Sequence, residues 1–143
     1  MEKEVGGVME GILSLAKDNL LEALDEWVER NKDVIGEKLA NRLKKEAKRF
    51  SREYAEEEEF SKEAIVGGFS LWLFHVLHIL GVKCSAIGGK IEEITILPET
   101  WEKGFDKQST ERLVRTIKHA FSISQNLWII KQRGRKDDRS STS

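Results

Sequence analysis

Several residue types are scarce in this sequence, and each shortage narrows the class of protein. A single cysteine excludes an internal disulfide framework. The chain has one proline, four asparagines and three glutamines beside many lysines and glutamates, a balance that favours a thermophilic source. A basic, apolar leader ending in small residues is not found, so we expect a cytoplasmic protein.

The common enzyme signatures are also missing. The sequence contains no Gly-rich phosphate loop ending in Gly-Lys-Ser/Thr, no Gly-x-Gly-x-x-Gly, no Gly-x-Ser-x-Gly and no His-Glu-x-x-His. Four adjacent acids, Glu56 to Glu59, would fan around a helix and so do not define a metal site. We expect no cofactor, and the missing signatures favour a protein that is not an enzyme.

What remains is the composition of one soluble globular domain. The 143 residues are 34% charged and 39% hydrophobic, with 24 basic against 25 acidic side chains. Helical periodicity dominates the first 60 residues. Apolar residues at steps of three and four predict one helix from about 8 to 29 and a second from about 34 to 57, joined as a helical hairpin near 31–33.

The third predicted helix carries no Lys, Arg, Asp or Glu over the 19 residues 64–82. A helix that is hydrophobic on every side is either central to a core or in a membrane. The run reaches the span length of about 20 residues only by counting two Gly, two His and a Ser, so we expect a central core helix and no membrane partner. Ser61 is its expected N-cap, and Gly81 its expected end.

The period then changes to that of strands. Two runs rich in β-branched residues, 82–87 and 90–97, flank Gly88-Gly89, and together they predict a β-hairpin over about 82–97. Pro98 ends the second strand, and Trp101 and Phe105 in the following connection are expected to pack against the core.

Ser109 is the expected N-cap of a fourth helix. Its expected inward positions are Leu113, Ile117, Ala120 or Phe121, Ser124, and Leu127 or Trp128. Residues 126–132 fit either helix or strand, and the polar residues 133–143 are expected to be disordered. The predicted fold is therefore α+β and predominantly helical: a four-helix bundle-like domain over 1–132 with one hairpin between its third and fourth helices.

Charge is unevenly placed along the chain, with a net charge of −5 in residues 1–63 and +4 in residues 64–143. The second predicted helix carries five basic residues at steps of four, three, four and three, which places them within an arc of about 80° opposite the apolar stripe. They would extend over roughly 21 Å at 1.5 Å per residue, enough to meet several backbone phosphates. These residues, which we call the basic strip, are Lys38, Arg42, Lys45, Arg49 and Arg52.

The tail adds further basic residues, among them Arg133, Arg135 and Lys136. Flexible basic tails add sequence-independent affinity through phosphate contacts and counterion release. The alternative for the strip is a solvated helix face paired with the nearby run of glutamates.

Three residues suggest a metal or an apolar ligand. His75 and His78 stand one helical turn apart, and Cys84 follows shortly afterwards. Imidazoles at this spacing can face one metal, with a thiolate completing part of the site, and an apolar pocket with histidines can also hold haem. The alternative is a pair of hydrogen-bonded core histidines and a buried cysteine.

One pair in the fourth helix suggests an enzyme. Arg112 and His119 are seven residues apart, which brings them within about 20° on a helix. The Arg, six residues, His arrangement resembles the catalytic pattern of the HEPN family of helical RNases, over 8 of the 143 residues. The resemblance implies that His119 activates the ribose 2′-hydroxyl, that Arg112 stabilises phosphate charge, and that two copies meet in a dimer. Leu113 stands where that family commonly has a polar residue.

The sequence thus favours a non-enzymatic interaction module or a small subunit of a larger assembly. Its expected partners are a protein or a second copy of the chain, with nucleic-acid backbone as a candidate ligand of the strip and tail. Two alternatives stay open, a HEPN-like RNase and a metal, haem or apolar-ligand sensor.

Overall fold

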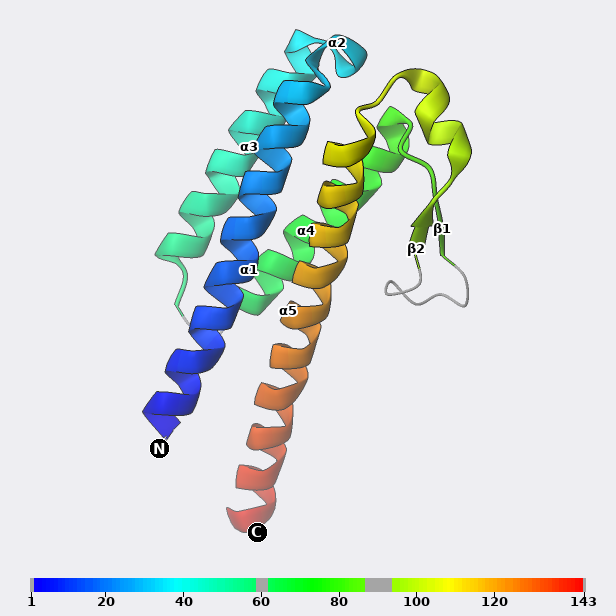
Figure 1. Ribbon diagram of the computed structural model, residues 1–143. Helices are drawn as coiled ribbons and strands as arrows, with labels where there is room; N and C mark the ends of the chain where they lie inside the picture. Colours follow the sequence, from blue (N-terminus) through cyan, green and yellow to red (C-terminus); the bar gives the residue numbers. More distant parts are fainter. Residues whose placement is uncertain (1, 59–61, 87–93, 143) are drawn as a thin grey trace.

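The computed structural model describes the backbone of residues 2–58, 62–86 and 94–142 and the side chains of residues 7–58, 62–85 and 94–134. The elements along the chain are α1 (Glu2–Arg30), α2 (Lys32–Ile35), α3 (Glu37–Glu56), α4 (Lys62–Leu80), β1 (Cys84–Ala86), β2 (Ile94–Ile96), the 3-10 helix η3 (Pro98–Lys103) and α5 (Lys107–Thr142). This order confirms the predicted class, predominantly helical with a hairpin between the last two long helices (Figure 1).

The core forms where α1, α4 and α5 meet. Figure 1 shows α1 and α5 running in opposite directions, with α4 crossing behind α5 and α3 beside α1. Leu20 and Trp27 of α1, Leu73 of α4, and Leu113 and Ile117 of α5 are all fully buried. Removing a side chain of this size from water stabilises the fold by about 1.5–3 kcal/mol. The predicted inward faces of α1 and α5 are therefore confirmed, with Ala120 and Leu127 taking the inward positions.

A buried polar junction connects the end of α1 to the start of α5. The indole Nε1 of Trp27 donates a hydrogen bond to Thr110 Oγ1 at 2.9 Å, and Asn31 Nδ2 donates to the Trp27 carbonyl at 2.7 Å. The N-cap of α5 is Asp106, whose carboxylate accepts the Ser109 backbone N–H at 2.9 Å. The prediction of Ser109 as the cap is wrong, because Asp106 lies three residues earlier and Ser109 is buried inside the first turn.

The strands pair in a different register from the one a tight turn predicts. β1 and β2 are antiparallel, with Cys84 opposite Ile96 and Ala86 opposite Ile94. A two-residue turn at Gly88-Gly89 would instead place Cys84 opposite Glu93, so the observed register is offset by three residues; the turn itself lies outside the described residues. The hairpin is tied to η3 by Thr100 Oγ1, which accepts the Lys83 N–H at 2.9 Å and donates to the Lys83 carbonyl at 3.1 Å.

Helix α4 is not enclosed on every side as a central core helix would be. Its buried residues, Val66, Ser70, Leu73 and Leu77 among them, follow one side of the helix. On the other side the large apolar side chains Leu71, Trp72 and Ile79 are exposed. The helix ends as predicted before Gly81, which has a φ of 120°. The predicted N-cap of this helix, Ser61, lies outside the described residues.

Helix α5 resolves the open question about residues 126–132, which are helical. The backbone stays helical to Thr142, so the helix continues without a break past residue 132, where the sequence predicted the end of the globular domain. Figure 1 shows this last part of α5 extending beyond the level at which α3 ends.

Candidate nucleic-acid interface

The basic strip lies on the outer face of α3. Its five members are all exposed, while the residues of α3 that are buried, Ala40, Leu43, Phe50 and Tyr54, follow the opposite side. Helical geometry produces this separation, since the strip and the apolar stripe keep the same three-and-four spacing half a turn apart. The strip is therefore a continuous cationic edge in contact with solvent.

Most of the strip is not neutralised by neighbouring acids. Arg49 Nε contacts Glu53 Oε1 at 3.0 Å, and its Nη1 lies 3.8 Å from Glu46 Oε2. Within the described residues, Lys38, Arg42, Lys45 and Arg52 form no ion pair. In particular, the described glutamates of the following run, Glu56–Glu58, do not pair with them. These four charges are available to an external anion.

A groove runs along the α4 side of the strip. One hollow of about 250 Å³ is lined by Arg42 and by apolar side chains of both helices: Leu39, Leu43, Trp72, Val76, Ile79 and Leu80. A second hollow, of about 350 Å³, is lined by Arg49 with its acidic partners Glu46 and Glu53, and by Phe50, Phe69 and again Trp72. Trp72 thus lies between the two hollows, and each hollow contains one arginine of the strip. Leu39 keeps the three-and-four spacing of the apolar stripe of α3 but is 38% exposed at this groove.

The ring of Trp72 is held by a stack of aromatic residues. Phe50 of α3 and Phe69 of α4 stack with their centroids 4.1 Å apart and an angle of 9° between the rings. Trp72 packs against Phe69 with a centroid distance of 5.6 Å and an angle of 30°. Phe50 is buried, Phe69 is half-buried and Trp72 is 38% exposed, so the stack leads from the core to the surface.

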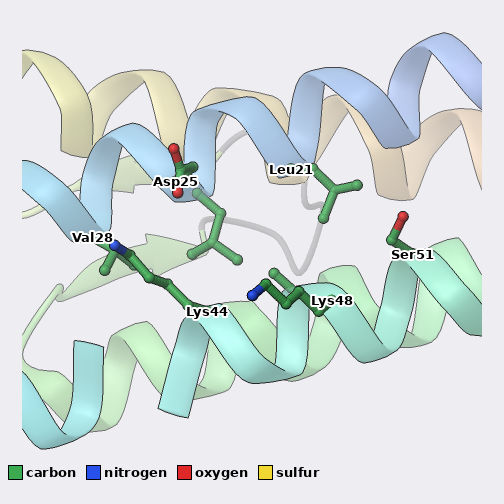
Figure 2. Close-up of a pocket in the computed structure, with 8 residues that line it drawn as sticks. Leu21, Asp25, Val28, Lys44, Lys48 and Ser51 are labelled. Carbon is green, nitrogen blue, oxygen red and sulfur yellow. The ribbon is translucent and has the colours of Figure 1, made fainter. Parts of the chain in front are cut away.

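The opposite flank of α3 is also lined by basic residues. Figure 2 shows the groove between α1 and α3, with Leu21 and Val28 of α1 facing Lys44 and Lys48 of α3. Its volume is about 250 Å³. Lys44 forms an ion pair with Glu29, and this contact lowers the pKa of the Glu29 carboxyl from its ordinary value. Because Lys44 is paired, this flank offers less free charge than the strip.

The basic residues of the tail belong to the last part of α5. Arg133 is exposed, whereas the side chains of Arg135 and Lys136 lie outside the described residues. Lys131, two residues before Arg133, forms an ion pair with the buried Glu63 of α4. The last turns of α5 lie beyond the end of α3 (Figure 1).

The Arg112 guanidinium is held by two acids of α1. It forms ion pairs with Glu26 and, at 3.4 Å, with Glu22. These contacts raise the pKa of Arg112, with the Glu26 hydrogen bond as the largest cause. His119 is exposed on the same helix. Two carboxylates beside Arg112 would compete with a substrate phosphate for its charge.

The predicted metal ligands are not gathered into one site. His75 and His78 are both exposed on α4, and Cys84 is half-buried in β1. Burial raises the pKa of the Cys84 thiol, which disfavours the thiolate that binds metal. In the part of the chain that the structure describes, no three His, Cys, Asp or Glu side chains are placed to hold a metal ion.

Other exposed apolar side chains lie at the end of the bundle where the chain begins. They belong to α1 and α5 and comprise Val8, Ile12, Leu15, Trp128, Ile129 and Ile130. Exposed apolar residues can mark interfaces when they are contiguous. The protein partner or homo-oligomer expected from the sequence stays a prediction. Among the described residues, α4 is the one helix that is long and apolar enough to cross a membrane. Core helices of soluble proteins can meet the same criterion. Of the 18-residue apolar stretch of α4, 28% is buried inside the protein.

Comparisons with known proteins add no relative. No protein-family model matches the chain, and neither a curated protein nor a solved structure matches it. The resemblance to the HEPN pattern therefore depends on Arg112 and His119 alone.

Proposed function

We propose that this protein is a non-enzymatic interaction module that binds the backbone of nucleic acids through the basic strip of α3. The observation that carries the proposal is the exposure of five basic side chains along one helix face, four of them without an ion pair among the described residues. Backbone phosphates at regular intervals match such a row of charges, and their neutralisation releases counterions.

The net charge of −1 does not oppose this function. Phosphate binding depends on the local charge of the contacting face, and acidic residues on other faces of the bundle are screened beyond about 8–10 Å at physiological ionic strength. Helix α3 itself carries seven basic and four acidic residues, and two of these acids, Glu46 and Glu53, pair with Arg49. A backbone lying along the strip therefore meets a net positive charge.

The proposal is tested by the affinity of a fluorescein-labelled oligonucleotide, measured by fluorescence anisotropy at moderate salt. We expect the triple variant Arg42→Ala, Lys45→Ala, Arg49→Ala to bind at least tenfold more weakly than the unmodified protein. The matched control removes three exposed charges elsewhere, by Lys103→Ala, Lys107→Ala and Arg115→Ala. Equal affinity of the two triple variants would overturn the proposal, because net charge alone would then explain binding.

A further inference from the structure

The groove between α3 and α4 combines charge with an exposed aromatic ring. Arg42 belongs both to the basic strip and to the lining of one hollow, and Arg49 belongs both to the strip and to the lining of the other. Along α3 the two arginines are separated by about 10 Å at 1.5 Å per residue. Trp72, which lines both hollows, lies across the groove on α4.

We infer that this groove binds unpaired bases, with a base stacked on Trp72 and the adjoining phosphate on Arg42, so that single-stranded nucleic acid is the ligand of the strip. This inference rests on the proposed function and names its substrate class. Aromatic rings beside a cationic track are the combination by which proteins bind single strands without reading their sequence.

The shape and composition of the groove support a base as its occupant. The hollow beside Arg42 is lined by apolar side chains and contains no acidic residue. A planar base can cover the apolar lining while its phosphate remains at the cationic rim. The aromatic stack behind Trp72 fixes the ring before binding, so less conformational entropy is lost when a base stacks on it.

A duplex does not fit this groove in the same way. The faces of paired bases are covered by their neighbours, and exposing one requires unstacking that costs a few kcal/mol. A single strand presents its base faces without that cost. The strip alone would bind both forms, so a preference for the single strand is specific to Trp72.

The chain supplies a matched control for this residue. Trp128 of α5 is 50% exposed, compared with 38% for Trp72, and it lies outside the groove. Trp72→Leu and Trp128→Leu therefore remove tryptophans of similar exposure. Trp72→Phe keeps an aromatic face at the site, and circular dichroism reports whether each variant is folded.

The experiment compares a labelled single strand of about 20 nucleotides with the duplex of the same length. We expect the unmodified protein to prefer the single strand. Trp72→Leu should weaken single-strand binding roughly 5- to 150-fold, the range that one stacked base supplies, and leave duplex binding unchanged. Trp128→Leu should change neither, and Trp72→Phe should retain most of the affinity.

Two outcomes would overturn the inference: equal effects of Trp72→Leu and Trp128→Leu, or a preference for the duplex. In either case the proposed function still stands if the triple variant of the basic strip loses binding. A third arm uses vesicles of mixed anionic and zwitterionic lipid, because an exposed tryptophan beside basic residues is also typical of membrane-surface helices. Binding to vesicles through Trp72 without binding to oligonucleotides would overturn both proposals.

Discussion

The side-chain amide of Asn31 binds the backbone of Asp106, the N-cap of α5. Its Oδ1 accepts a hydrogen bond from the Asp106 backbone N–H at 2.8 Å, across 75 positions of sequence. The Nδ2 of the same side chain donates to the Trp27 carbonyl at 2.7 Å and to Ser109 Oγ at 3.3 Å. Asn31 is fully buried. One amide thus satisfies polar groups of α1 and α5 and fixes the crossing of the two helices that contribute most of the core.

Replacing this amide should destabilise the protein. We expect Asn31→Ala to lower the free energy of unfolding by about 1–3 kcal/mol, because buried hydrogen-bonding groups lose their partner. Urea denaturation followed by circular dichroism measures the change. Asn126→Ala is the control, since Asn126 is exposed on α5 and its loss should stay within about 0.5 kcal/mol. An Asn31→Ala protein as stable as the control would contradict the role assigned to the junction.

The cap at Asp106 should make part of the stability depend on pH. Hydrogen bonds from Ser109 hold the pKa of the Asp106 carboxyl below its ordinary value. A carboxyl whose pKa is lower in the folded state stabilises the fold above its unfolded pKa of about 3.9, and the contribution is lost as the pH falls through the folded value. At pH 7, we expect Asp106→Ala to cost about 0.5–2 kcal/mol, as helix caps do.

The measurement is the difference in unfolding free energy between the unmodified protein and Asp106→Ala, taken at neutral pH and again well below pH 4. Other acids titrate in both proteins and cancel in the difference. The difference should narrow in acid; a gap that stays constant or widens would show that the carboxylate is not what stabilises the start of α5.

The ion pair between Lys131 and Glu63 should contribute to the free energy of unfolding. Glu63 is 3% exposed, and its Oε2 has no hydrogen-bond partner, so the carboxylate depends on the lysine that contacts Oε1. We expect Lys131→Ala to lower the unfolding free energy by about 1–3 kcal/mol, and Glu63→Gln in the same chain to recover part of this loss. Arg133→Ala, an exposed neighbour, should have little effect. A double variant less stable than Lys131→Ala alone would contradict the idea that the loss comes from leaving the buried Glu63 carboxylate without its lysine.

The contacts of Arg112 predict that RNA stays intact. Because Glu22 and Glu26 hold the guanidinium, we expect no shortening of a labelled single-stranded RNA incubated with the protein without added metal. Denaturing gel electrophoresis reads out the length. Cleavage that disappears in His119→Ala but persists in Lys38→Ala would contradict this prediction and support the HEPN-like alternative.

Much of the fold could be predicted from spacing alone. The buried faces of α1, α3 and α5 follow apolar residues at three-and-four steps, and the exposure of the basic strip follows from the same geometry. Gly81 ends α4 as expected. These features depend on helix periodicity and local conformational preference, which a single sequence records.

The features that could not be predicted depend on which elements meet. The residues of α4 are apolar on every side, so periodicity gave no sign that Trp72 faces outward, and the groove beside Arg42 remained hidden. Asp106 and Ser109 are both good caps, and burial of Ser109 beside Asn31 decides between them. The acids that hold Arg112 come from α1, 86 positions away in the case of Glu26.

The salt dependence of oligonucleotide affinity tests whether the basic strip of α3 is the nucleic-acid interface. For a single strand, the slope of log affinity against log salt falls by about 0.7 for each phosphate contact that is removed. The variant Arg42→Ala, Lys45→Ala, Arg49→Ala should have a slope smaller in magnitude by about 1.4 to 2 than the unmodified protein, from the unpaired charges of Arg42 and Lys45 and the paired charge of Arg49, with no such change for Lys103→Ala, Lys107→Ala, Arg115→Ala. An unchanged slope in the strip variant would contradict the assignment of α3 as the nucleic-acid interface.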